Sequence, residues 1–135
     1  MIETYGLTKY FSKLCAVDNL NLKVEKEIFG LLGPNGAGKS TTVLMLTTLL
    51  RPSTGKASVC GYDVVRDAKK VRNAISYVPQ GMAVDMKLTG YENVMLYAKL
   101  YGVPERKRKV DEVLELMGLS ERKDEQVRNY SGGMR

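Results

Sequence analysis

The segment that most constrains this chain is the glycine-rich turn at residues 33–40, Gly-Pro-Asn-Gly-Ala-Gly-Lys-Ser, which matches the pattern G-x-x-x-x-G-K-[ST]. The turn follows an apolar run at 28–32, Ile-Phe-Gly-Leu-Leu, and precedes a stretch at 39–50 whose apolar residues recur at helical spacing. This pattern needs a strand before it and a helix after it. The sequence therefore predicts a phosphate-binding loop in an α/β fold, with 28–32 as a strand buried in a parallel sheet.

The residue types in the turn suit a triphosphate. Glycines at 36 and 38 let the backbone curl and turn its N–H groups toward phosphate oxygens, and the following helix points its positive end there. Lys39 supplies a charge for the β- and γ-phosphates, and Ser40 supplies a hydroxyl ligand for Mg²⁺. The loop alone leaves kinases, GTPases, helicases and transporters open. The predicted nucleotide-binding residues of the loop are Asn35, Gly36, Ala37, Gly38, Lys39, Ser40 and Thr41.

Composition removes several other kinds of site. The 135 residues include two cysteines 45 positions apart and no histidine, which excludes a disulfide framework, a zinc knuckle and histidine-based catalysis. Neither a signal peptide nor an apolar run of about 20 residues is visible, so we expect any membrane role to come through a partner. The net charge of +6 is spread along the chain and is weak evidence for nucleic-acid binding.

The predicted secondary structure changes after residue 80, from a mixture of strands and helices to helices alone. Residues 1–26 are rich in strand patterns, and 16–24 alternate as a half-buried antiparallel strand should. We expect two domains: residues 1–81 as an α/β core that contains the loop, and 82–135 as a helical insert. The expected strands are 57–60 and 75–78, and the expected helices are 66–74, 89–101 and 104–117.

Residues 130–135, Tyr-Ser-Gly-Gly-Met-Arg, complete a set of motifs in a fixed order. Together with the loop at 33–41 and Val-Pro-Gln at 78–80, they make the chain resemble the nucleotide-binding domain of an ATP-binding cassette (ABC) transporter. The Ser-Gly-Gly core resembles the signature motif of that family, and Gln80 falls where the family carries its Q-loop glutamine. Phe11 falls where an aromatic ring stacks on adenine, with Tyr10 as the alternative.

The resemblance implies a P-loop NTPase fold: a RecA-like core with an antiparallel β subdomain and a helical insert. It implies catalytic roles for Lys39 and Gln80, Mg²⁺ contacts from Ser40 and Gln80, an adenine contact from Phe11 and an ATP contact from Val17. Ser131, Gly132 and Gly133 would close on the ATP of a second nucleotide-binding domain, in a homodimer or heterodimer. The resemblance also implies that an integral membrane permease is a partner and that the chain lies on the cytoplasmic face of the membrane. It implies no nucleic-acid partner.

The sequence also departs from the family. It stops after the signature, before the acidic strand, the catalytic glutamate and the switch histidine that the family carries. The resemblance therefore implies an N-terminal half, incomplete C-terminally, with uncovered apolar surface, weak nucleotide binding and little or no turnover. Met134 replaces the common glutamine, and the glycine that usually lies between the residues corresponding to Lys26 and Glu27 is missing, which shortens a turn.

The stretches 47–64 and 88–104 resemble most closely the ATP-binding subunits of daunorubicin-resistance-type multidrug exporters. Such a subunit would couple ATP binding and hydrolysis to export of a drug-like or lipid-like substrate through a separate membrane subunit. Two alternatives stay open. One is a non-transport ABC ATPase acting on DNA or ribosomes, although the coiled coils and zinc-binding cysteines of such relatives are absent from this sequence. The other is a catalytically inactive nucleotide-binding remnant.

Overall fold

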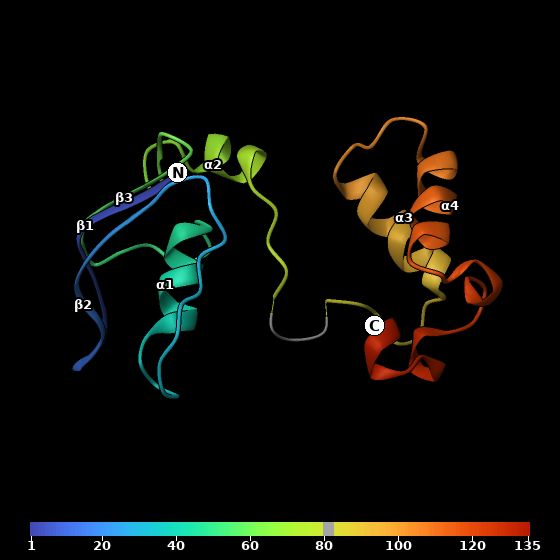
Figure 1. Ribbon diagram of the computed structural model, residues 1–135, viewed down its shortest axis with the longest axis horizontal. Helices are drawn as coiled ribbons and strands as arrows, with labels where there is room; N and C mark the ends of the chain where they lie inside the picture. Colours follow the sequence, from blue (N-terminus) through green and yellow to red (C-terminus); the bar gives the residue numbers. More distant parts are fainter. Residues whose placement is uncertain (80–82) are drawn as a thin grey trace. The chain divides into compact units, whose positions relative to one another are not determined.

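The computed structural model describes residues 1–79 and 83–135. It divides into two compact units, Met1–Tyr77 and Val78–Arg135. Figure 1 shows the strands with α1 and α2 in the first unit, and α3 and α4 in the second. The expected boundary after residue 81 and the expected site residue Gln80 both lie outside the described residues.

The first unit is built on an antiparallel sheet with the strand order β2-β1-β3-β4. Its strands are β1 (Ile2–Phe11), β2 (Leu14–Val24), β3 (Thr54–Val59) and β4 (Tyr62–Asp63). β1 and β2 form a hairpin in which Phe11 pairs with Leu14. The expected strand at 16–24 lies within β2 and is confirmed. β3 starts three residues before the expected strand and ends before Cys60, whose φ of 52° cannot continue a strand.

The two helices of this unit are α1 (Lys39–Leu46) and α2 (Ala68–Ala74). Met45 of α1 and Val71 of α2 pack against Leu7 and Val17 of the sheet in one buried cluster. α1 begins at the expected residue but ends four residues early. At its end the Thr47 hydroxyl bonds to the Val43 carbonyl at 2.9 Å, and Thr48 takes a φ of 65°. β-Branched threonines are poor helix formers, which explains this early end.

The parallel strand expected at 28–32 and the strand expected at 75–78 do not form, and these predictions are wrong for the described residues. Both segments lie outside any strand. Ile28 and Leu32 are 105% and 92% exposed, and Val78 is exposed as well. An apolar run becomes a central strand only when neighbouring strands cover its edges and other elements cover its faces. No strand within the described residues pairs with either segment.

The second unit packs α3 (Gly90–Leu100) against α4 (Arg106–Leu116) around Ala98, Val110 and Leu114. These helices confirm the expected ones at 89–101 and 104–117, with ends that differ by one or two residues. Thr89 caps α3: its hydroxyl accepts from the Glu92 N–H, and the Glu92 carboxylate accepts from the Thr89 N–H. Three short 3₁₀ helices follow: η1 (Ser120–Arg122), η2 (Val127–Asn129) and η3 (Gly132–Met134).

Candidate functional site

Gly38 fixes the position of the glycine-rich loop against the sheet. It is the residue before α1, and its φ is 78°. A Cβ at this position would lie 2.3 Å from the Ala16 carbonyl oxygen and 3.0 Å from Cγ2 of Val17. Because β2 approaches the loop so closely, only glycine fits there. Val17 thus lies beside the loop, with its own side chain buried in the core of the first unit.

The start of α1 is electrostatically open. Its N-cap residue is Gly38, which offers no side-chain acceptor, and the first turn contains no acidic residue. The first N–H groups of a helix have no partner inside the helix and carry its positive partial charge. No side chain within the described residues balances that charge at this helix start. The loop residues next to it, Asn35, Gly36 and Ala37, are exposed, so an anion can reach the helix start.

Lys39 folds back across the loop. Its Nζ donates to the carbonyl oxygens of Gly33 and Pro34, at 2.7 and 2.6 Å. Both acceptors are neutral, and Lys39 forms no ion pair in the part of the chain that the structure describes. The ammonium charge is thus held in place over the loop and remains available to an anion.

Phe11 lies at the end of β1 and is 45% exposed. The Nζ of Lys9 lies 5.3 Å from the centroid of the Phe11 ring, within the range of a cation–π contact, and it also donates to the Arg51 carbonyl. The alternative aromatic, Tyr10, is also exposed, and the hydrogen bond and charge of neighbouring Cys15 raise its pKa. No hydrogen bond, ion pair or ring contact among the described residues joins Phe11 to the loop.

The Ser-Gly-Gly segment lies in the second unit. Ser131 precedes η3, and the Met134 N–H donates to the Ser131 carbonyl at 3.1 Å. η3 has only three residues. Ser131, Gly132 and Gly133 are all exposed, and a Cβ added at either glycine would meet nothing within 4 Å. The segment is therefore accessible from outside.

Sequence reasoning missed the packing that holds this segment in place. Tyr130 is buried, and its hydroxyl donates to the Arg122 carbonyl at 2.7 Å. A Cβ at Gly90, the first residue of α3, would lie 2.2 Å from that hydroxyl. Gly90 therefore gives Tyr130 room to pack against the start of α3. The one available signal was a glycine inside a helical pattern, which often marks a close approach.

The described residues offer few ligands to a metal ion. No group of three His, Cys, Asp or Glu side chains within them could hold one. The predicted ligand Ser40 is exposed next to Lys39, and the other predicted ligand, Gln80, lies outside the described residues. A lone hydroxyl is compatible with Mg²⁺, which keeps several waters and takes phosphate oxygens as ligands. This donor set fits a metal that arrives with a phosphate ligand.

Fold and loop together define a nucleotide-binding protein of the P-loop class, and comparison with known proteins gives the family. A family model described as "ABC transporter" matches residues 17–135. The chain belongs to the ABC transporter family. In the described residues no helix is long and apolar enough to cross a bilayer.

Two of the curated relatives of this chain are drug-resistance proteins. The chain is 44% identical to the daunorubicin/doxorubicin resistance ATP-binding protein DrrA of Streptomyces peucetius, over 99% of this chain and 42% of that protein. It is 39% identical to the linearmycin resistance ATP-binding protein LnrL of Bacillus subtilis, over 100% of this chain and 44% of that protein. The chain thus spans less than half the length of these curated relatives. The predicted resemblance to the daunorubicin-resistance type is confirmed.

Solved structures show the same fold. An ATP-binding subunit of an ABC transporter superposes with a TM-score of 0.81 at 28% identity, covering 98% of this chain and 57% of that one. A dimeric ATP-binding cassette bound to ADP and phosphate superposes with a TM-score of 0.80 at 24% identity, covering 99% and 65%. The second likeness concerns the fold alone. These matches confirm the predicted fold class, including its antiparallel β part.

Proposed function

We propose that this chain carries the ATP-binding part of an ABC transporter subunit for export of a drug-like or lipid-like compound. The observation that carries the proposal is the open start of α1, where Gly38 is forced by the fold and no side chain of the described residues neutralises the helix end. Residues 1–81 would form part of the ATP-binding core, and 82–135 would form the signature part.

The loop would hold the phosphates through its backbone N–H groups. Lys39 would exchange its bonds with two neutral carbonyls for bonds with β- and γ-phosphate oxygens, which are stronger because both partners are charged. Phe11 would stack on the base, with Val17 supporting the loop from β2. Ser40 would contribute one oxygen to Mg²⁺, which supplies further neutralisation of the triphosphate, and Gln80 is the proposed second contact.

The Ser131 segment would act on a second copy of the domain. Its exposed hydroxyl and glycines fit an approach to the γ-phosphate that the partner holds. ATP would then join the two domains, and hydrolysis would remove the γ-phosphate contacts and favour opening. The chain would lie on the cytoplasmic face of the membrane, and a separate integral membrane permease would convert this movement into export. The names of the resistance proteins DrrA and LnrL support this assignment.

Equilibrium binding of ATP to the 135-residue chain tests the first step. Lys39→Ala should weaken ATP binding at least tenfold, since a hydrogen bond between charged groups contributes about 1.5–3 kcal/mol. Lys26→Ala is the matched control, because Lys26 is an exposed lysine outside the loop, and it should leave the affinity within about twofold. Equal affinities for Lys39→Ala and the unchanged chain would exclude the loop as the ATP site.

A further inference from the structure

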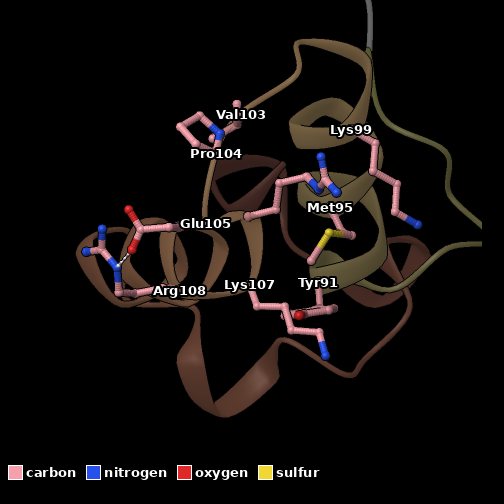
Figure 2. Close-up of a pocket in the computed structure, with 9 residues that line it drawn as sticks. Tyr91, Met95, Lys99, Val103, Pro104, Glu105, Lys107 and Arg108 are labelled. Atoms are coloured by element: carbon pink, nitrogen blue, oxygen red, sulfur yellow. Dashed lines mark hydrogen bonds and ion pairs between the residues drawn. The ribbon is translucent and has the colours of Figure 1, made fainter.

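A hollow lies at the α3–α4 turn of the second unit, and none of its lining residues belongs to the proposed ATP contacts. It has a volume of about 850 Å³, which is within the usual range for a ligand pocket. Its apolar lining comes from Tyr91, Met95, Val103 and Pro104. Its basic lining comes from Lys99, Arg106, Lys107 and Arg108. Figure 2 shows Met95 between Lys99 and Lys107 in this view.

The basic side chains that line this hollow differ in whether they form ion pairs. Arg108 is neutralised, because it pairs with Glu105 and with Glu112, and these bonds raise its pKa. Figure 2 marks the Glu105–Arg108 pair. Lys99, Arg106 and Lys107 form no ion pair within residues 1–79 and 83–135. Three uncompensated positive charges therefore surround one partly apolar hollow.

The same turn exposes apolar side chains. Leu100 is 71% exposed and Tyr101 is 79% exposed, immediately after Lys99. A second, mainly apolar hollow of about 320 Å³ shares Val103 with the first and is also lined by Tyr101. Exposed leucine and tyrosine beside basic residues are typical of segments that lie at a membrane surface. An acidic protein segment would match the charges alone and leave these apolar residues uncovered.

We propose that the α3–α4 turn binds anionic phospholipid at a membrane surface. Lys99, Arg106 and Lys107 contact the lipid phosphate, and Leu100 and Tyr101 enter the boundary between headgroups and acyl chains. Membrane leaflets rich in anionic lipid attract such basic segments. This contact is independent of ATP, because none of these residues belongs to the proposed nucleotide site. It would hold the helical unit at the bilayer without a membrane-crossing helix.

A single tryptophan makes the contact visible, because the chain has none. Leu100→Trp should shift its emission to the blue with phosphatidylcholine vesicles that contain 30% phosphatidylglycerol, and not with phosphatidylcholine alone. Ile28→Trp is the matched control, since Ile28 is also exposed and apolar but lies in the other unit. A shift for Ile28→Trp and none for Leu100→Trp would overturn the proposal.

Charge variants in the Leu100→Trp background give the second test. Lys99→Gln, Arg106→Gln and Lys107→Gln together should lower vesicle partitioning roughly a hundredfold, or about fivefold for each charge. Lys56→Gln, Lys69→Gln and Lys87→Gln remove the same charge elsewhere and should change it less than about threefold. Equal losses in both triple variants would contradict the proposed site.

Competition identifies the ligand. Inorganic phosphate at a few millimolar should not release the chain from the vesicles, whereas raising the salt concentration should, because the attraction is electrostatic. Release by millimolar phosphate at constant ionic strength would mean a phosphate site and would overturn the lipid proposal. An acidic peptide that binds through Lys99, Arg106 and Lys107 while vesicles do not would also overturn it. Lys39→Ala should leave vesicle binding unchanged.

Discussion

The phosphate loop and the Ser131 segment both contain glycines, but Gly38 of the loop and the two glycines of the Ser131 segment have different surroundings. Gly38 has a φ of 78°, and a side chain there would press on the Ala16 carbonyl. Gly132 and Gly133 have no positive φ, and open space surrounds them. The fold of this chain requires the first glycine and not the other two. A glycine that its own chain does not need fits a surface that another molecule approaches closely.

The helix starts show the same contrast. α3 is closed by its own residues, because Thr89 and Glu92 bond to each other's backbone N–H groups. α1 has no such side chain and begins at a glycine. A capped start stabilises the helix, whereas an uncapped one leaves its N–H groups to a ligand. α1 thus leaves open a helix start of the kind that α3 closes.

The largest stability effect should come from Gly38→Ala. The new methyl group would meet the Ala16 backbone oxygen, and alanine would be held in the left-handed region. We expect the free energy of unfolding to fall by about 3 kcal/mol, measured by urea denaturation followed by circular dichroism. Gly36→Ala separates the two causes. Gly36 has a φ of 85° but open space around it, so its cost should be about 1 kcal/mol. Equal losses in the two variants would refute the close approach of β2.

Gly90→Ala should give the next largest loss, about 2 kcal/mol in the same assay, because the methyl group would overlap the Tyr130 hydroxyl. The double variant with Tyr130→Phe removes that hydroxyl. In this background Gly90→Ala should cost less than about 1 kcal/mol, although Tyr130→Phe itself loses the bond to the Arg122 carbonyl and should cost about 1 kcal/mol. Strictly additive losses would show that the two residues do not touch.

Thr89→Ala should lower the free energy of unfolding by about 1 kcal/mol, because α3 loses the side chain that accepts from the Glu92 N–H. Thr89→Ser is the matched control, since serine keeps the hydroxyl and should restore most of the stability. Urea denaturation checks both variants. A loss of equal size in Thr89→Ser would show that the methyl group, and not the cap, stabilises this helix start.

Local signals predicted much of this molecule. The turn before α1, the alternating part of β2, α3 and α4 follow from turn residues, alternation and helical spacing, each of which acts over a few neighbouring residues. The capping box at Thr89 was also readable, since a threonine followed three residues later by glutamate is its usual signature. α1 ends early because of its threonines. The prediction followed the apolar spacing instead and therefore made this helix too long.

The failures share a dependence on distant partners. The apolar run at 28–32 and the short segment at 75–78 predicted strands, but a strand also needs neighbouring strands, and a short segment does not say where they are. Tyr130 packs on Gly90 across 40 positions of sequence, which no local pattern records. The roles of Phe11, Lys39 and Ser131 in nucleotide binding remain predictions, because residue type and position suggest a ligand without fixing its contacts.

The smallest stability effect should come from the signature glycines. A small effect there would separate a role in binding a second molecule from a role in stabilising this chain. Gly132→Ala and Gly133→Ala should each change the free energy of unfolding by less than about 0.5 kcal/mol, because an added Cβ meets open space at a φ that alanine adopts readily. In the family's full-length subunit, the corresponding substitutions should abolish ATP-dependent dimerisation measured by light scattering, with Ser131→Ala weakening it. Unchanged dimerisation would remove these glycines from the proposed interface. A large loss of stability would instead show that the chain needs them for itself, and the contrast with Gly38 would fail.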